Sequence, residues 1–386
     1  MDLFPFASLL LFISLTDASG YEDRECGHDP SNLWLDVVIV VDNSKNMTEY
    51  NLHLVFGNIA EVFGQETRIG TNYEDPRSTR VALVTYNQDA TIVADLNKLQ
   101  SFEELFNLVK TTLSDVATKD ESRLEKGLTA AEQVLTTGRS NNYRSNYKQI
   151  VIVYTATYQS TLQSNPVVVA DRLKSKAVNI AVVDMNCKDI SVYQSLLNIA
   201  SYPLAAEYTS RTSLFITIAL FQTNCFCVDD SWFHYRNPNE MQMSGVCVKV
   251  FNETISSWKV AKLSCQSSIP NGYLVTDFDI MKHSVLNELY RLSTGFTPNY
   301  HIGLTYMNGD WYWQQPKGQE LVKLSSTNNF ESTFWNMGYP ISTTVNTGVA
   351  NVQDGTEKGW KNINANVDYK NYICEVDTCD TDNYCS

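Results

Sequence analysis

Between residues 30 and 222 the chain alternates short apolar runs with longer amphipathic stretches. The apolar runs, rich in Val and Ile, predict strands at Leu35–Val41, Val81–Tyr86, Thr91–Asp95, Ile150–Thr155 and Asn179–Val183. The stretches between them predict helices at Asn51–Phe63, Phe102–Leu113, Leu124–Leu135, Val167–Lys176 and Val192–Ser201. Strands that lack a polar face and alternate with helices are typical of a parallel sheet covered on both sides. We therefore expect an α/β domain over residues 30–222.

The pattern changes near Cys225, where tryptophans, cysteines and irregular polar stretches begin to dominate. Only two helical patterns follow, at Ser257–Ser264 and Ile280–Leu292, among short strand-like runs with turn residues. This favours a second, α+β domain over residues 225–376. The remaining residues, 377–386, form an acidic, Cys-containing tail that we expect to be solvated.

The N-terminus predicts secretion. An apolar core at Leu3–Leu15 precedes the small residues Ala18, Ser19 and Gly20, which indicates a signal peptide over residues 1–20, although Asp2 replaces the usual positive charge. A membrane-spanning helix needs about 20 apolar residues, and no run of the chain reaches that length. We expect a secreted, extracellular protein without membrane insertion.

Cysteine content and charge fit this compartment. Seven of the nine cysteines follow residue 220, which predicts a C-terminal part stapled by disulfides, and the odd number leaves one thiol free or paired with another chain. In a secreted protein, the two Asn-x-Ser/Thr sequons that begin at Asn46 and Asn252 predict N-glycosylation. The net charge of −14 argues against nucleic acid and against an anionic membrane surface as partners.

A candidate metal loop follows the first predicted strand. Asp42, Ser44 and Asn46 place a carboxylate and two short polar side chains at alternate positions. Ligands of parallel sheets lie beyond the carboxyl ends of the strands, so a second carboxylate should follow the strand Ile150–Thr155. The sequence there reads Thr155-Ala156-Thr157 and contains no carboxylate.

Three segments carry a resemblance to the von Willebrand factor A domain: VVIVVDNSKN at the first strand, RVALVTYN at Arg80–Asn87, and Ser122-x-Leu124-x-x-Gly127-Leu128. The resemblance implies a Rossmann-like fold and a metal-ion-dependent adhesion site, built in that family by Asp-x-Ser-x-Ser, a later Thr and a later Asp. Such oxygen ligands suit Mg²⁺. Asp42 and Ser44 match the family pattern, Asn46 stands at the second Ser, and Ser122 at the Thr.

Two interpretations of this loop stay open. Asp42, Ser44, Asn46 and Ser122 could hold Mg²⁺ or Ca²⁺ weakly. Alternatively, Asp42 and Ser44 are inherited scaffold that caps the following helix. Ala156 removes one of two carboxylates, and a glycan on Asn46 would crowd the pocket. We expect no cofactor, with a divalent cation as the alternative.

The second domain resembles a C-type lectin-like domain. The residues that carry this resemblance are Cys227 with Trp232, Gly245-Val246-Cys247, Ser257-Trp258-x-x-Ala261-x-x-x-Cys265, His301-Ile302-Gly303-Leu304, Trp311-x-Trp313 and Tyr372-Ile373-Cys374-Glu375. The resemblance implies a Cys265–Cys374 disulfide and a partner for Cys247 at either Cys227 or Cys225.

The Ca²⁺- and sugar-binding triplets of that family are altered here. Tyr339-Pro340-Ile341 replaces Glu-Pro-Asn or Gln-Pro-Asp, and Trp360-Lys361-Asn362 replaces Trp-Asn-Asp. A lysine ammonium repels Ca²⁺, which takes six to eight oxygen ligands. Tyr339, Pro340, Ile341, Trp360 and Asn362 remain candidate ligand contacts. For the tryptophans Trp311 and Trp313 we expect core packing rather than sugar stacking.

One cysteine scheme combines these expectations. Cys26 and Cys225 flank the first domain, whose first and last elements usually end close together in this family, so we predict Cys26–Cys225. Cys227–Cys247, Cys265–Cys374 and Cys379–Cys385 would then leave Cys187 free. A Cys225–Cys247 bridge is the competing arrangement.

Nothing in the motifs predicts an enzyme, since metalloprotease, serine-hydrolase and phosphate-loop patterns are missing and the five histidines are scattered. The tandem resembles secreted nematode proteins associated with innate immune recognition. We expect a recognition or adhesion glycoprotein that binds an extracellular protein ligand without metal. The alternatives are a carbohydrate-binding lectin and an extracellular-matrix component linked covalently through the odd cysteine.

Overall fold

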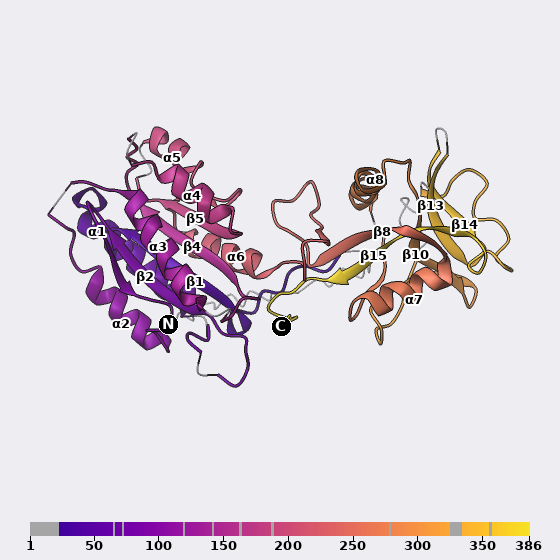
Figure 1. The fold of residues 1–386 in the computed structure, drawn as a ribbon, viewed down its shortest axis with the longest axis horizontal. Helices are drawn as coiled ribbons and strands as arrows, with labels where there is room; N and C mark the ends of the chain where they lie inside the picture. The colour runs from indigo at the N-terminus through magenta and orange to yellow at the C-terminus, as the bar shows by residue number, and fades with distance from the viewer. Residues whose placement is uncertain are drawn as a thin grey trace, which may run out of the picture.

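The computed structural model describes residues 23–386 apart from 65, 72, 119, 141, 142, 162, 163, 187, 188, 278, 325–333, 355 and 356. The expected signal peptide and Cys187 lie outside the described residues. Figure 1 shows two lobes joined by extended segments, with the first domain on the left and the second on the right. No helix in the described part of the chain is long and apolar enough to cross a bilayer.

The first domain is built on a six-stranded sheet of order β3-β2-β1-β4-β5-β6. The strands are β1 (Leu35–Asp42), β2 (Arg80–Tyr86), β3 (Ala90–Ala94), β4 (Lys148–Thr155), β5 (Val178–Asp184) and β6 (Ala205–Glu207). The helices are α1 (Thr48–Phe63), α2 (Phe102–Thr112), α3 (Leu124–Gly138), α4 (Pro166–Lys174), α5 (Ile190–Leu196) and α6 (Thr212–Asn224), with short 3₁₀ turns η1 (Pro30–Asn32) and η2 (Lys45–Met47).

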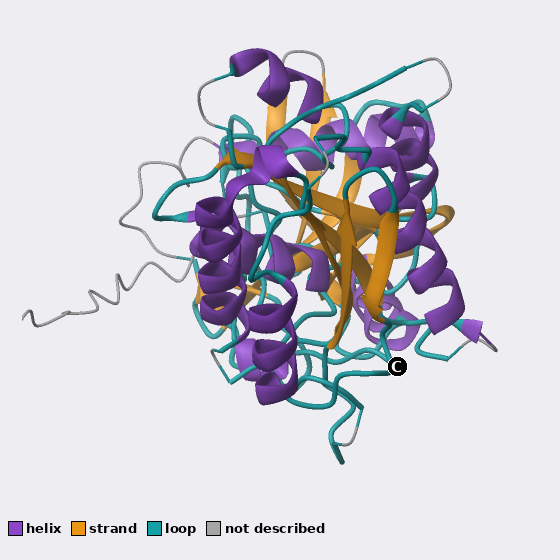
Figure 2. Ribbon diagram, turned by 90° about the vertical axis from the view of Figure 1, so that its left-hand side faces the viewer, coloured by secondary structure: helices purple, strands orange, loops and turns teal. Residues whose placement is uncertain are grey.

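The apolar runs form the strands because both faces of the sheet are covered. Val37, Ile39 and Val41 of β1 pack into one buried cluster with α1, α2 and α6, while Val38 and Val40 pack into another with α3, α4 and α5. Figure 2, which views this domain end-on, shows the helices on both sides of the strands. The α/β Rossmann-like fold expected for this part is confirmed.

The sheet is mixed rather than wholly parallel, which corrects the expectation. Strand β3 runs antiparallel to β2. Only three residues, 87–89, separate the two strands, and so short a connection cannot return the chain for a parallel pairing.

The second domain carries a nine-stranded sheet with the main order β12-β11-β10-β15-β8-β7. Its strands are β7 (Phe233–His234), β8 (Val246–Ser257), β9 (Tyr273–Leu274), β10 (Asn299–Met307), β11 (Asp310–Trp313), β12 (Val322–Lys323), β13 (Gly348–Asp354), β14 (Glu357–Ile363) and β15 (Tyr369–Asp377). Both expected helices are present, as α7 (Trp258–Ser268) and α8 (Ile280–Thr294).

Four disulfides connect the described cysteines: Cys26–Cys225, Cys227–Cys247, Cys265–Cys374 and Cys379–Cys385. The structure therefore holds the predicted scheme and not the competing Cys225–Cys247 bridge.

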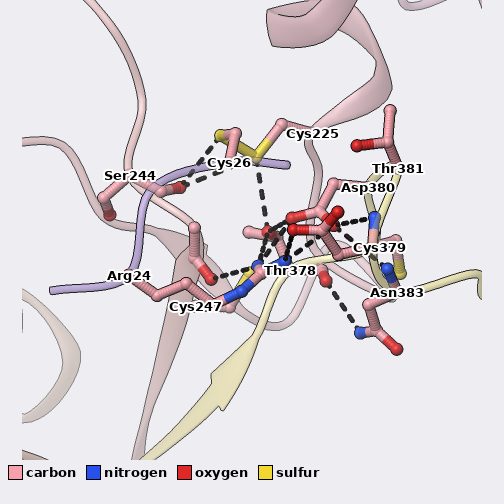
Figure 3. Close-up of polar contacts among 12 residues, drawn as sticks. Arg24, Cys26, Cys225, Ser244, Cys247, Thr378, Cys379, Asp380, Thr381 and Asn383 are labelled. Carbon is pink, nitrogen blue, oxygen red and sulfur yellow. Dashed lines mark hydrogen bonds and ion pairs between the residues drawn. A yellow bond between two sulfur atoms is a disulfide. The ribbon is translucent and has the colours of Figure 1, made fainter. Parts of the chain in front are cut away.

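The C-terminal tail is partly buried, which corrects the expectation of a solvated tail: residues 378–381 are buried, whereas Asp382 and Ser386 are exposed. The Asp380 carboxylate accepts hydrogen bonds from Nη1 and Nη2 of Arg24 at 2.6 and 2.8 Å (Figure 3). Trp34 donates from Nε1 to the Asp380 carbonyl at 2.9 Å, and its ring lies 4.8 Å from that of Tyr384. We call these four residues the junction clasp. Pairing with Arg24 lets the acidic tail leave water and return to the first domain.

Candidate functional site

The strand-end loop of the first domain brings together three of its four candidate ligands. Asp42 ends β1, Ser44 follows it, and Ser122 lies just before α3. The Ser44 amide donates to Asp42 Oδ1 at 2.8 Å, and the Ser122 hydroxyl donates to Asp42 Oδ2 at 2.7 Å. All three residues are buried.

Thr155 at the end of β4 joins this group. Its hydroxyl oxygen lies 3.3 Å from Asp42 Oδ2 and 2.9 Å from the Thr157 carbonyl oxygen, and its single proton can be donated to one of them at a time. The next residue, Ala156, is buried and offers no side-chain oxygen. The sheet therefore delivers one carboxylate and several hydroxyls to this point.

The structure does not bring Asn46 into the same contact set. Its side chain is exposed, and Nδ2 donates to the Asp120 carbonyl at 2.9 Å. The fourth expected ligand is thus engaged with the loop before α3.

The electrostatics of Asp42 follow from its surroundings. Burial raises the pKa of the Asp42 carboxyl, and hydrogen bonds from Ser122 and Ser44 oppose that rise. Burial, and then the charge of Asp42, raise the pKa of the neighbouring Tyr86 hydroxyl well above its usual value. The donors on Asp42 are neutral, and the buried Ser44 hydroxyl has no hydrogen-bond partner among the described residues. Because Ala156 provides no side-chain oxygen, the loop offers a divalent cation only one charged ligand.

A polar groove lies beside Ser122. A cavity of about 750 Å³ is lined by Glu121, Arg123, Glu125, Lys126, Gln159, Thr161 and Ser164. Its charges have both signs, and Ser164 donates to Glu125 across it at 3.0 Å. The sequence analysis did not predict this groove. The charged residues on either side of Ser122 were the feature of the sequence that could have indicated it. The groove can hydrogen-bond and pair with a polar partner surface.

In the second domain, Asn362 of β14 closes the loop that carries Tyr339, Pro340 and Ile341. Its Oδ1 accepts from the Ile341 amide at 2.8 Å, and its Nδ2 donates to the carbonyls of Ile341 and Asn346 at 2.9 and 3.0 Å. Asn362 is buried. The amide that could have offered an oxygen to Ca²⁺ binds the loop backbone instead.

Trp360 is not a surface contact, which corrects its place among the candidate ligand residues. It is buried, and its Nε1 donates to Asp277 Oδ2 at 2.8 Å. The same oxygen lies 2.7 Å from Nδ1 of His283, and although burial opposes the charged imidazole, Asp277 raises the pKa of His283. Trp313 is buried as expected, and Trp311 is half-buried.

Three apolar side chains on and beside the clamped loop are exposed. Met337 is 87% exposed, Ile341 45% and Val345 55%. The sequence interpretation named only Ile341 of these. We call these three side chains the apolar tip. Exposed polar residues, Ser342 and Thr344, lie between them in the sequence, so the loop presents apolar and polar side chains together.

A third cluster combines Cys26, Cys225 and His234, whose ligand atoms lie within 4.8 Å of one another. The two sulfur atoms form a disulfide, so neither provides the thiolate that a metal would need.

The chain matches two known domain families. A model of the von Willebrand factor type A domain matches residues 36–222, and a model of the lectin C-type domain matches residues 254–376. C-type lectin domain-containing protein 160 of Caenorhabditis elegans is 25% identical over 384 residues, covering 94% of this chain and 56% of that protein. The chain thus spans about half the length of this curated relative.

Solved structures share parts of the fold. Proximal thread matrix protein 1 from the mussel byssus, in a form with a zinc-occupied metal-ion-dependent adhesion motif, is 17% identical, covers 50% of this chain and 47% of its own, and gives a TM-score of 0.40. The C-type lectin domain of murine dendritic cell inhibitory receptor 2, in complex with an N-glycan, is 19% identical, covers 39% of this chain and 98% of its own, and gives 0.28. At these TM-scores neither bears on what this chain binds.

The two families typically bind other molecules rather than catalyse reactions, and the disulfides fit an oxidising, extracellular compartment. A role in recognition or adhesion follows from the domains themselves. The chain combines a von Willebrand factor type A domain with a C-type lectin domain.

Proposed function

We propose that this chain is a secreted, non-enzymatic recognition protein that binds an extracellular protein partner without a metal ion. The observation that supports the proposal is that a candidate ligand at each expected cation site is hydrogen-bonded within the protein, while Ala156 and Lys361 stand where further oxygen ligands would be expected. Asp42 is satisfied by Ser44 and Ser122, and Asn362 by the backbone of its own loop.

Two surfaces support binding of a protein. The groove beside Ser122 offers charges of both signs for polar contacts. The apolar tip, Met337, Ile341 and Val345, offers side chains that a partner would desolvate. Interfaces depend on a few well-packed apolar anchors and on the polar contacts around them. The groove, on the first domain, offers polar contacts, and the apolar tip, on the second domain, offers apolar ones.

Thermal unfolding with and without cations tests the proposal. We expect the same midpoint for the wild-type protein in EDTA and in excess Mg²⁺ or Ca²⁺. The matched variant Ala156→Asp restores the second carboxylate beside Asp42, and a cation at about a hundred times its Kd should stabilise it by about 2.7 kcal/mol. A cation-dependent shift in the wild type would contradict the proposal.

A carbohydrate ligand is the second candidate. The half-buried rings of Trp311 and Trp335 lie 5.1 Å apart, and aromatic faces can stack on sugars. On a glycan array the protein would then bind equally with and without EDTA, and Trp335→Ala would lose that binding. An array without signal removes this candidate.

A third candidate is an extracellular-matrix component linked through Cys187. A covalent oligomer on a non-reducing gel, lost in Cys187→Ser, would support it, and a monomer would refute it. The setting we propose for the leading function is innate immune recognition. Unchanged susceptibility to bacteria after loss of the gene would count against that setting.

A further inference from the structure

Strand β8 presents a sugar acceptor on a segment that leaves the sheet. Residues 252–255 have no partner in the register of β8 with β15, and all four are exposed. They contain the sequon Asn252-Glu253-Thr254, so the fold leaves room for a sugar chain on Asn252. We propose that a glycan on Asn252 lies against the carboxyl end of α8 and covers an apolar pair there, Leu292 and Phe296.

The Asn252 side chain is anchored at that helix end. Helix α8 packs against β8 (Figure 1), and Nδ2 of Asn252 donates to the Ser293 carbonyl at 3.1 Å. The last carbonyls of a helix have no partner within the helix itself, so this amide caps α8. The position of Nδ2 therefore fixes where an attached sugar begins.

Attachment of a sugar is compatible with this hydrogen bond. In the secretory pathway, a transferase would move an oligosaccharide from a lipid pyrophosphate carrier to Asn252: the bond from the sugar C1 carbon to the phosphate oxygen breaks, and a bond from C1 to Nδ2 forms. An Asn amide nitrogen has two protons. One of them leaves in the transfer, and the other can still be donated to the Ser293 carbonyl. The fold then holds the first sugar at the end of α8.

The end of α8 offers that sugar an apolar surface. Leu292, which directly precedes Ser293, is 77% exposed, and Phe296, three residues after Ser293, is 72% exposed. Between them Gly295 ends the helix with a φ of 74°, and a Cβ placed on it would meet nothing within 4 Å. The faces of a sugar ring carry C–H bonds that can pack on aliphatic and aromatic side chains. Covering the pair would remove apolar surface from water.

The glycan would also decide which exposed apolar surface of the second domain remains free for a partner. No Asn-x-Ser/Thr sequon lies within residues 334–350, which include the apolar tip. The tip would therefore stay uncovered, while the sugar closes the end of α8.

Secretion of the full chain from insect cells, followed by peptide mapping and thermal unfolding, tests the proposal. Thr254→Ala removes the sequon but keeps Asn252 and its hydrogen bond, whereas Thr254→Ser keeps the sequon and is the matched control. We expect a glycan on Asn252 in the wild type and in Thr254→Ser. Without it, the melting midpoint of Thr254→Ala should fall by about 2–4 °C, the shift that the loss of one modest contact causes in a domain of this size. In a chain that also carries Leu292→Ser and Phe296→Ser, Thr254→Ala should lower the midpoint no further.

An unchanged midpoint in Thr254→Ala would overturn the proposal. An equal loss with and without the two apolar side chains would overturn it too, because the glycan would then act without touching them. Should Thr254→Ala not be secreted, Leu292→Ser with Phe296→Ser in the glycosylated chain must lower the midpoint, since replacing side chains that face water changes stability little.

The proposal rests on the proposed secretion of the chain but not on the identity of its ligand. A secreted chain without sugar on Asn252 would overturn this proposal alone. Retention of the wild type inside the cell would overturn both this proposal and the proposed secretion.

Discussion

Replacing Asn362 with alanine tests how the lectin-domain loop is held without Ca²⁺. The side chain makes three hydrogen bonds to the backbone of Ile341 and Asn346. At about 1 kcal/mol net for each, Asn362→Ala should lower the free energy of unfolding of this domain by about 3 kcal/mol. Water can reach part of the loop and replace some of these bonds, so a loss of about 2 kcal/mol would still agree.

Urea unfolding followed by tryptophan fluorescence measures this loss. Six of the seven tryptophans lie between Trp232 and Trp360, so the signal reports mainly on the second domain. Asn366→Ala, at an exposed position a few residues beyond, is the control and should stay within about 0.5 kcal/mol of wild type.

The protease sensitivity of the loop gives a second readout. Without its clamp, the segment around Tyr339 should be cut by chymotrypsin faster than in wild type, while Asn366→Ala is cut at the wild-type rate. If Asn362→Ala leaves both stability and cleavage unchanged, the loop is held by something else and our reasoning about the missing Ca²⁺ fails. The same holds if EDTA alone destabilises the wild-type loop.

Three further predictions concern stability. Burial lowers the pKa of His301 from 6.5 to about 4, so between these pH values the unfolded chain binds a proton that the folded chain does not. The free energy of unfolding should therefore fall by at most about 3 kcal/mol as the pH drops from 6.5 to 4. In urea titrations, His301→Asn should reduce this dependence on pH. A Cβ at Gly127 would lie 2.7 Å from the Tyr86 ring, whereas a Cβ at Gly57 would meet nothing within 4 Å. Measured by calorimetry, Gly127→Ala should lower the free energy of unfolding by about 1–3 kcal/mol, and Gly57→Ala should raise it by up to about 1 kcal/mol. Equal effects of the two substitutions would contradict this reasoning. Arg24→Ala leaves the buried Asp380 carboxylate unpaired and should cost about 3 kcal/mol, whereas an unaltered melting temperature would show that the junction clasp contributes little.

Most elements could be predicted because their periodicity is local. The continuous apolar runs of β1 and β4 need only a sheet covered on both faces. Helix α6 could not be distinguished from a strand by its sequence, because Leu214–Phe221 is a mostly apolar run without a clear helical or strand period. Strand β6 was missed since its three residues are too few to show an alternation.

The candidate site could be predicted only as far as single positions allow. The amino-acid sequence by itself determined that Asp42 lies at a strand end, that Ala156 removes a carboxylate, and that the tandem joins two families of binding domains. Each of these conclusions follows from a short stretch of sequence and from the chemistry of its residues. None of them requires knowing which distant segments are in contact.

Only the tertiary structure decided which partners satisfy each polar group. Ser122 reaches Asp42 across 80 residues, Asn362 reaches Ile341 across 21, and Arg24 reaches Asp380 across 356. The acidic tail shows the physical reason most clearly. An unpaired run of charged side chains is most stable in water, but a carboxylate that is paired with a cation can be buried. Whether such a cation lies next to the tail depends on how the whole chain folds.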